Sequence, residues 1–340
     1  MIKKNKLTVL QEKADEYVFS GAYYAKNGHE TLQGSNGFAN RSEKILNQVD
    51  TRFSIASGSK LFTAFAICML VEEGEISFQS KLKDCLDIDF PQFDESITMH
   101  HLLTHTSGVP DYFDEDVMEN YESLWKTRPM YHIRSLKDFL PMFQNEKMQE
   151  ECGRSFHYNN TGYLLLGLIV EQVAGCKFSD FVEERIFRKV GMKRSGYFEM
   201  DRLPENTALG YIEEEDGNWK TNIYSLPVKG GSDGGVYVTV KDIAQFWHSL
   251  TSHQLLSKEI TEAFFKPREV VDEEDGIYYG YCGFMEMNPD GQVVKFIQMG
   301  YDPGVNYRSV FYPSTNTTIV VCSNESEGAY EILKEIEIIL

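Results

Sequence analysis

Residues 57–74 have the sequence SGSKLFTAFAICMLVEEG, which is the most apolar helical pattern in the chain. Apolar side chains recur on every face of the helix that this stretch would form, and such a helix must be buried on all sides. Gly74 follows directly and is a typical helix stop. We therefore predict that residues 57–73 form a buried central helix, with the other elements packed around it.

Strand-like segments occur near both ends of the chain, on either side of this helix. They alternate in polarity or are rich in β-branched and aromatic side chains, and they cover residues 20–26, 30–38, 293–298, 305–311 and 317–322. The dipeptide Asn27-Gly28 joins the first two segments and predicts a β-hairpin. Helical patterns at residues 7–17 and 330–340 accompany these strands.

The middle of the chain alternates polar loops with helical patterns, of which residues 163–174 and 178–190 are the clearest. We predict an α/β (α+β) fold, in which an antiparallel sheet from both termini is flanked by helices and carries an all-helical inserted domain. Residues 1–80 and 205–340 would form the sheet domain, and residues 81–204 the helical domain. This layout places a cleft between the two parts, where binding sites commonly form.

Composition and charge restrict the possible partners. Of the 340 residues, 42% are hydrophobic and 25% are charged, as in ordinary globular proteins, and the formal net charge is −19. An acidic surface repels nucleic-acid phosphates and anionic lipid headgroups, so we expect a small-molecule partner rather than nucleic acid or membrane. The longest apolar runs, residues 64–71 and 163–170, are too short to cross a bilayer. The lysine-rich residues 1–6 are not followed by the apolar segment of a secretory signal, so a cytoplasmic location is expected. The sequence leaves the oligomeric state open.

The six cysteines form no Cys-x-x-Cys pair. Cys68 and Cys322 lie in apolar stretches, where a free thiol behaves as a small hydrophobic group. We therefore expect six reduced cysteines, no disulfide framework and no zinc site. The catalytic motifs described below also require no metal or cofactor.

The first of these motifs is Ser-Gly-Ser-Lys at residues 57–60, at the start of the central helix. Lys60 follows Ser57 by one helical turn, and a partly desolvated lysine can accept the hydroxyl proton or stabilise the alkoxide. The N-terminus of a helix also favours a developing oxyanion, although Ser57 could instead serve only as a helix N-cap. Two other serine–lysine pairs have the same spacing but lie in polar stretches: Ser80–Lys83 and Ser123–Lys126.

The second motif, Tyr-Asn-Asn at residues 158–160, is the only Tyr-x-Asn in the chain. A tyrosine beside a lysine ammonium loses its proton more easily and can act as a base. The Asn160 amide can hold the lysine and bind a substrate carbonyl. In the alternative interpretation, Tyr158 is a loop residue before a helix that Asn160 caps.

The third motif, Gln-Met-Gly at residues 298–300, lies at the end of a predicted strand. Gly300 would let a substrate lie against the strand edge, and the Tyr301 N–H could be an oxyanion donor beside that of Ser57. The alternative is an edge strand that enters a turn.

Together, the three motifs resemble those of the serine penicillin-recognising family, which includes class C β-lactamases, DD-peptidases and related esterases. That family has Ser-x-x-Lys, then Tyr-x-Asn, then Lys-Thr-Gly or His-x-Gly on a strand, and the motifs here have the same order and similar spacing. Other stretches that resemble the family are residues 53–57, 102–111, 191–192 and 234–237, and Asp242. The resemblance runs from about residue 20 to the C-terminus and implies a β-lactamase/transpeptidase-like fold.

The resemblance and the residues predict one chemistry, acyl transfer to Ser57 followed by hydrolysis. Lys60 and Tyr158 would share the proton handling, in an order that the sequence leaves open. Gln298 departs from the family, which usually has lysine or histidine at this position. Without a cation to bind a substrate carboxylate, a neutral ester or amide is the favoured substrate. Arg308 on the next strand could supply the missing charge instead. β-Lactam hydrolysis, penicillin binding, D-amino-acid peptidase activity and slow acylation without turnover stay open.

Two further patterns are set aside. Residues 230–234 match the Gly-x-Ser-x-Gly elbow of α/β-hydrolases, but no histidine follows His253, so we interpret them as a flexible loop. His101 and His105 have the spacing of a zincin helix. Leu102 occupies the position of the necessary glutamate, and Thr106-Ser107-Gly108 then breaks the helix, which indicates a structural turn.

Overall fold

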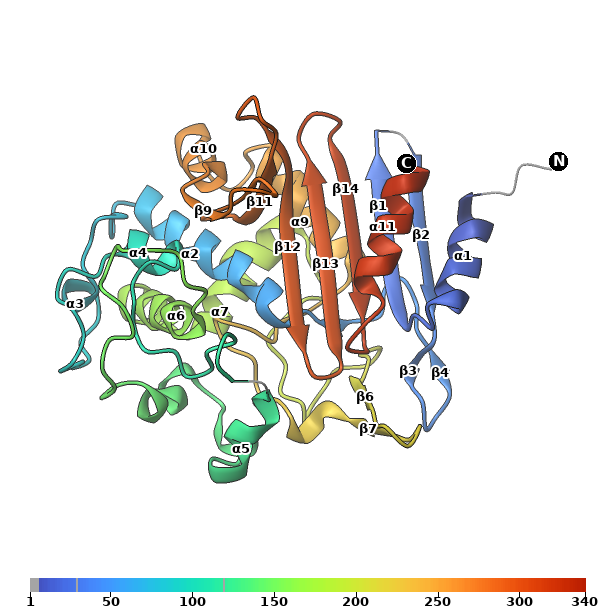
Figure 1. Ribbon diagram of the computed structural model, residues 1–340, viewed down its shortest axis with the longest axis horizontal. Coiled ribbons are helices and arrows are strands. Elements are labelled where there is room, and N and C mark those ends of the chain that lie inside the picture. The colour runs from blue at the N-terminus through green and yellow to red at the C-terminus, as the bar shows by residue number, and fades with distance from the viewer. Residues whose placement is uncertain (1–5, 29, 119) are drawn as a thin grey trace.

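A computed structural model describes residues 6–28, 30–118 and 120–340 of the protein. An eight-stranded antiparallel sheet has the order β2-β1-β14-β13-β12-β11-β10-β9 (Figure 1). Its strands are β1 (Gly21–Asn27), β2 (Glu30–Asn36), β9 (Glu269–Asp272), β10 (Ile277–Gly280), β11 (Gly283–Met287), β12 (Val293–Asp302), β13 (Val305–Tyr312) and β14 (Thr317–Ser323). Strand β1 pairs with β14, with Gly21 opposite Ser323. The predicted fold class, a sheet built from both ends of the chain, is confirmed.

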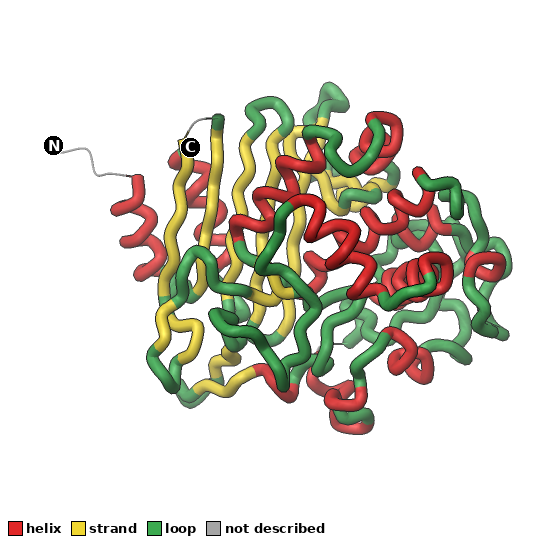
Figure 2. Tube along the Cα trace, turned by 180° about the vertical axis from the view of Figure 1, so that it is seen from behind, coloured by secondary structure: helices red, strands yellow, loops and turns green. Residues whose placement is uncertain are grey.

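Helices cover both faces of this sheet (Figure 1, Figure 2). One face carries α1 (Lys6–Glu16) and α11 (Ala329–Ile339), and the other carries α2 (Lys60–Glu72), α9 (Val240–Thr251) and α10 (Lys258–Phe265). Successive side chains of a strand point to opposite faces. Val310 of β13 therefore packs with α11, whereas Phe311 stacks on Trp247 of α9.

Shorter elements connect the sheet to the helical region. The remaining α-helices are α3 (Leu82–Cys85), α4 (Met99–Leu103), α5 (Leu124–Thr127), α6 (Asn160–Ala174), α7 (Phe178–Val182) and α8 (Arg188–Val190). The 3₁₀ turns are η1 (Ala56–Ser59), η2 (Tyr121–Ser123), η3 (Met130–His132), η4 (Leu136–Met142) and η6 (Asn222–Tyr224), and the π-helical turn η5 (Glu183–Phe187) joins α7 to α8. Two-stranded sheets pair β3 (Phe38–Asn40) with β4 (Ile45–Leu46), β5 (Phe53–Ser54) with β8 (Tyr237–Val238), and β6 (Tyr211–Glu213) with β7 (Trp219–Thr221). The residue limits of the two domains stay a prediction, since one hydrophobic core continues through both parts.

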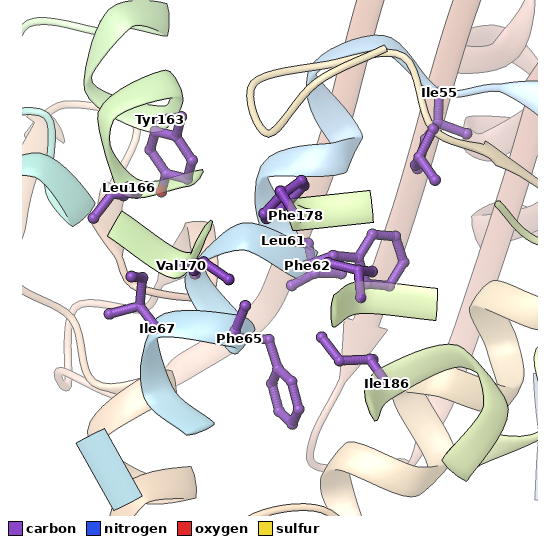
Figure 3. Close-up of a cluster of buried hydrophobic side chains, with 14 of the residues drawn as sticks. Ile55, Leu61, Phe62, Phe65, Ile67, Tyr163, Leu166, Val170, Phe178 and Ile186 are labelled. Carbon is purple, nitrogen blue, oxygen red and sulfur yellow. The ribbon is translucent and has the colours of Figure 1, made fainter. Parts of the chain in front are cut away.

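Helix α2 is the centre of that core (Figure 3). Every residue from Lys60 to Leu70 is buried, and Phe62 packs edge-on against Phe187 and Phe246. Burying each large apolar side chain contributes roughly 1.5–3 kcal/mol, so this helix anchors the elements around it. The predicted buried helix is confirmed, but η1 precedes it, so Ser57 lies in a 3₁₀ turn rather than in the α-helix.

No helix in the described parts of the chain combines the length and the apolar character that crossing a bilayer requires. All six cysteines carry free thiols.

Candidate active site

Ser57 lies in η1, which is packed directly against β12. The approach is close because residue 300 has no side chain. A Cβ at Gly300 would overlap the Ile55 carbonyl oxygen and lie 2.9 Å from the Gly58 nitrogen. Gly300 therefore allows the serine turn to reach the strand. The sequence suggested a different reason, an open strand edge for a substrate, but the backbone of η1 occupies that space.

Lys60 is buried beside Ser57 and has three hydrogen-bond partners. Its Nζ donates to Ser57 Oγ at 3.1 Å, to Asn160 Oδ1 at 2.7 Å and to the main-chain oxygen of Asp233 at 2.8 Å. Only 4% of the residue is exposed. An ammonium group has three hydrogens, and here each has an acceptor. The group is therefore fixed in orientation as well as in position.

Asn160 reaches Lys60 because its neighbour caps helix α6. The Asn159 side chain accepts the Gly162 N–H at 2.7 Å, as an N-cap residue does. Asn160 is the first residue of the helix, and its amide is free to bond Lys60. The alternative in which Asn160 is the cap is therefore wrong.

The segment 102–111 surrounds the start of α6. The Asp111 carboxylate accepts the N–H of Asn160 at 2.8 Å and that of Thr161 at 2.9 Å. Burial raises the pKa of Asp111 to about 7, and these two donors oppose the rise. An acidic group at a helix N-terminus is also favoured by the helix dipole. Asp111 thus holds the first turn of α6 in the place where Asn160 meets Lys60.

His105, from the same segment, holds the chain on both sides of Tyr158. Its main-chain oxygen accepts the His157 N–H at 2.8 Å, and its Nδ1 accepts the Asn159 N–H at 3.0 Å. Burial lowers the pKa of His105 well below its usual value, so the ring is neutral and carries its hydrogen on Nε2, 3.0 Å from the Tyr279 hydroxyl. The His105 and Tyr158 ring centroids are 4.5 Å apart. His105 is thus a positioning residue, in agreement with its interpretation as part of a structural turn.

Tyr158 lies against both Lys60 and Ser57. Its ring centroid is 4.9 Å from Lys60 Nζ. Burial raises the pKa of Tyr158 well above its usual value and the negative charge of Glu115 adds to the rise, whereas the interaction with the Ser57 hydroxyl opposes it. The phenol therefore stays protonated at ordinary pH and can donate a proton, but it is not a resting phenolate base.

Two cavities meet at Ser57. The predicted site residues divide between them: Ser57, Asn160 and Tyr301 line the larger, and Ser57, Lys60, Tyr158 and Gln298 line the smaller. The larger has a volume of about 480 Å³ and the smaller about 20 Å³. Small-molecule sites usually measure roughly 300–1,000 Å³, so only the larger cavity can receive a substrate.

Gln298 is directed away from the larger cavity. Its Nε2 donates to the main-chain oxygen of Cys282, just before β11, and only 5% of Gln298 is exposed. Arg308 does not replace the missing cation, because its guanidinium lies 5.9 Å from the Tyr330 ring centroid, on the α11 face of the sheet. Neither residue brings positive charge to the cavity.

The glycine-rich residues 230–235 form a wall of the larger cavity. The stretch is a loop, as predicted, but it is not an exposed one, because Asp233 is only 6% exposed and Ser232 is fully buried. The Gly235 N–H donates to the Ala56 oxygen at 3.2 Å and attaches the loop to η1. No sequence motif identifies Asp233, because its bond to Lys60 comes from the main chain. An aspartate inside a glycine run was the only signal.

The competing serine–lysine pairs have other partners at the surface. Lys83 forms an ion pair with Glu95, and the Ser123 hydroxyl donates to the Asn120 oxygen at 2.6 Å. Neither pair shares the buried environment of Ser57 and Lys60.

One group of side chains among the described residues has the spacing of a metal site. Ligand atoms of Asp114, Asp116 and His157 lie within 4.8 Å of one another. His157 Nε2 is 3.5 Å from the Asp114 carboxylate and Nδ1 is 3.6 Å from that of Glu150, so direct interactions among these side chains explain the cluster equally well. None of the three lines either cavity at Ser57.

Known proteins share both the sequence pattern and the fold. The profile of the beta-lactamase family matches residues 8–339. Penicillin-binding protein 4* of Bacillus subtilis is 30% identical over 360 aligned positions, which cover 99% of this chain and 76% of that protein. A penicillin binding protein from Bacillus halodurans has a crystal structure that superimposes with a TM-score of 0.92 at 52% identity, over 97% of this chain and 100% of that one.

A further neighbour is known by its structure. The D-amino acid amidase from Ochrobactrum anthropi SV3 superimposes with a TM-score of 0.79 at 20% identity, over 98% of this chain and 97% of that one, and this likeness concerns the fold alone. Family profile, sequence relatives and fold agree, and the chain belongs to the beta-lactamase family.

Proposed function

We propose that this protein is a serine hydrolase that acts on a small ester or amide through an acyl-enzyme at Ser57. Members of the beta-lactamase family are serine hydrolases, and one neighbour with the same fold is named an amidase. The observation that carries the proposal is the set of three acceptors around Lys60 Nζ.

Two of these acceptors are carbonyl oxygens, which cannot donate a hydrogen bond. A neutral lysine has two hydrogens, and these can stay bonded to Asn160 Oδ1 and to the Asp233 oxygen. The lone pair of Lys60 then faces Ser57 Oγ at 3.1 Å and can accept its proton. Asn160 and Asp233 thus support Lys60 as the general base.

The reaction would proceed in two steps. Ser57 Oγ attacks the substrate carbonyl carbon while its proton passes to Lys60, and the N–H groups of Ser57 and Tyr301 stabilise the oxyanion. When the bond to the leaving group breaks, the Tyr158 phenol donates its proton to that group and regains one from Lys60. Water then attacks the acyl carbon while its proton passes to Lys60. The bond between the acyl carbon and Ser57 Oγ breaks, Ser57 Oγ regains a proton from Lys60, and the acid product leaves.

Covalent labelling tests the nucleophile. A fluorophosphonate is expected to add one reagent mass at Ser57, and Ser57→Ala to abolish labelling and lower kcat for a nitrophenyl ester by about 10³-fold or more. Ser232→Ala is the matched control, because this serine lies in the Gly-x-Ser-x-Gly sequence with its hydroxyl buried and unbonded among the described residues. Ser232→Ala should be labelled by the fluorophosphonate to the same extent as the wild type. Labelling that persists in Ser57→Ala, or maps to Ser232, would contradict the proposal.

Slow acylation without turnover is a second candidate, favoured by two relatives that are named as penicillin-binding proteins. It would use the same chemistry at Ser57, with the acyl-enzyme as its end point. Pre-steady-state kinetics distinguish the two. Product that continues to form after the first equivalent indicates a hydrolase, and a burst that stops at one equivalent indicates a penicillin-binding protein.

A further inference from the structure

The larger cavity at Ser57 has more acidic than basic side chains. The charged residues that line it are Glu115, Glu122, Asp233, Asp302 and Lys220. Lys220 Nζ lies 3.4 Å from the Glu122 carboxylate, so these two charges offset each other. The remaining three carboxyl groups have no basic partner in the lining.

Asp302 differs from Glu115 and Asp233 in its surroundings. It follows Gly300 by two positions on β12, so both residues face η1 from the same side of the strand. No residue in the described ranges donates a hydrogen bond to its carboxylate or pairs with it. By contrast, Asp233 accepts the Tyr112 hydroxyl at 2.5 Å, and Glu115 is exposed to water. Asp302 is therefore a partly buried carboxyl group that faces the cavity without a partner.

The rest of the lining indicates what kind of cation could join it. Seven aromatic residues share this lining: Tyr112, Phe113, Tyr121, Phe139, Phe198, Tyr237 and Tyr301. Aromatic faces attract organic cations, whereas small divalent metal ions prefer shells of oxygen ligands and water. A carboxylate among aromatic rings therefore fits an organic ammonium group.

We propose that Asp302 is a specificity-determining residue that selects ester or amide substrates carrying an organic ammonium group on an apolar body. This inference rests on the proposed function, because it places the ammonium group in the cavity that opens onto Ser57. A substrate with a carboxylate would instead meet Asp302 and Asp233, and Gln298 offers it no cation. Substrate charge would then decide which esters are hydrolysed.

A series of three nitrophenyl esters tests the proposal. One acyl chain ends in a trimethylammonium group, the second in the isosteric tert-butyl group, and the third in a carboxylate. At about pH 9, where the Asp302 carboxyl group is mostly charged, we expect the wild-type protein to prefer the cationic ester to the neutral one by roughly tenfold in kcat/KM, and to use the anionic ester least. Asp302→Asn should reduce the cationic-to-neutral ratio to near one.

Asp290→Asn is the matched control, because Asp290 is an exposed acidic residue in a turn and its replacement changes the net charge equally. Its cationic-to-neutral ratio should equal that of the wild type. As a measurement on the wild type alone, choline should inhibit competitively and its tert-butyl isostere should not.

The outcomes separate the two proposals. Turnover of the neutral ester at Ser57 with no cationic preference, or with a ratio that Asp302→Asn leaves unchanged, overturns the role of Asp302 and leaves the hydrolase intact. Equal inhibition by choline and its isostere also overturns it. Absence of all turnover and of Ser57 labelling overturns both.

Discussion

At the scale of single residues, the ionisation of Asp302 changes the charge of the substrate cavity. Burial raises the pKa of Asp302 to about 8, the negative charge of Asp233 adds to the rise, and Lys60 opposes it. The titratable and charged groups that face it are Asp233, Glu115, Lys60, Tyr121 and Tyr237. The carboxyl group is therefore mostly neutral below pH 8 and mostly charged above it.

This ionisation predicts a pH dependence. For the trimethylammonium ester, whose charge is permanent, kcat/KM relative to the neutral isostere should rise as pH increases through about 8. The sign follows because the charged form of Asp302, which attracts the cation, is the form populated at higher pH. Asp302→Asn should give a ratio that is flat with pH. A ratio that falls over this range, or a rise that survives in Asp302→Asn, would contradict the prediction.

Sequence motifs identified the side chains that the structure brings together around Ser57, because side-chain chemistry is visible in a sequence. They did not identify Asp233, whose main-chain oxygen bonds Lys60, since any residue type has such an oxygen. The sequence also could not predict the direction of the Gln298 side chain. It depends on a main-chain oxygen of Cys282 that only the pairing of β11 with β12 brings within reach.

At the scale of elements, the first turn of α6 is stabilised by a carboxylate from another segment. Asp111→Asn replaces one of its two acceptor oxygens with an NH₂ group that cannot accept the Asn160 or Thr161 N–H. We expect the free energy of unfolding to fall by about 1–2 kcal/mol, as for a lost helix cap. Activity should fall by roughly tenfold or more, because Asn160 positions Lys60. Urea denaturation and ester kinetics measure the two effects.

The matched control is Ser257→Ala, which removes the N-cap of α10 away from the cavity. It should cost a similar free energy of unfolding and leave activity unchanged. Equal activity losses in both variants would mean that reduced stability, and not the position of Asn160, lowers the rate.

Element boundaries were harder to predict than element types. Strand β12 was predicted to end near Gln298 but continues to Asp302, where Gly300 pairs with Tyr307 and Asp302 with Val305 of β13. Glycine and aspartate are poor strand formers, so only the partner strand extends β12 through them. The 3₁₀ turn before α2 likewise lies against β12, a contact that no local sequence pattern contains.

At the scale of the whole molecule, thiol reactivity reports on packing. Cys176 is exposed, whereas Cys68, Cys282 and Cys322 are buried, and burial raises the pKa of these three thiols. A thiol-specific chromogenic reagent should therefore react rapidly with Cys176 in the native protein and with all six cysteines after denaturation. Cys176→Ser should remove the rapid phase. Fewer than six thiols in the denatured protein would reveal a disulfide and count against the cytoplasmic location, which stays a prediction.

The pairing of β1 with β14 has a consequence for how the molecule is made. Gly21 and Ser323 are neighbours in the sheet but about 300 positions apart in the chain. A ribosome that adds about 5–20 residues per second needs roughly 15–60 s to synthesise the segment between them. During that interval β1 has β2 as its only partner in the eight-stranded sheet of the described chain, and its other edge is unpaired. The nascent chain therefore exposes unpaired backbone N–H and C=O groups along β1 for most of its synthesis, and these groups could pair with another chain. A chaperone bound during this period would protect the chain from aggregation.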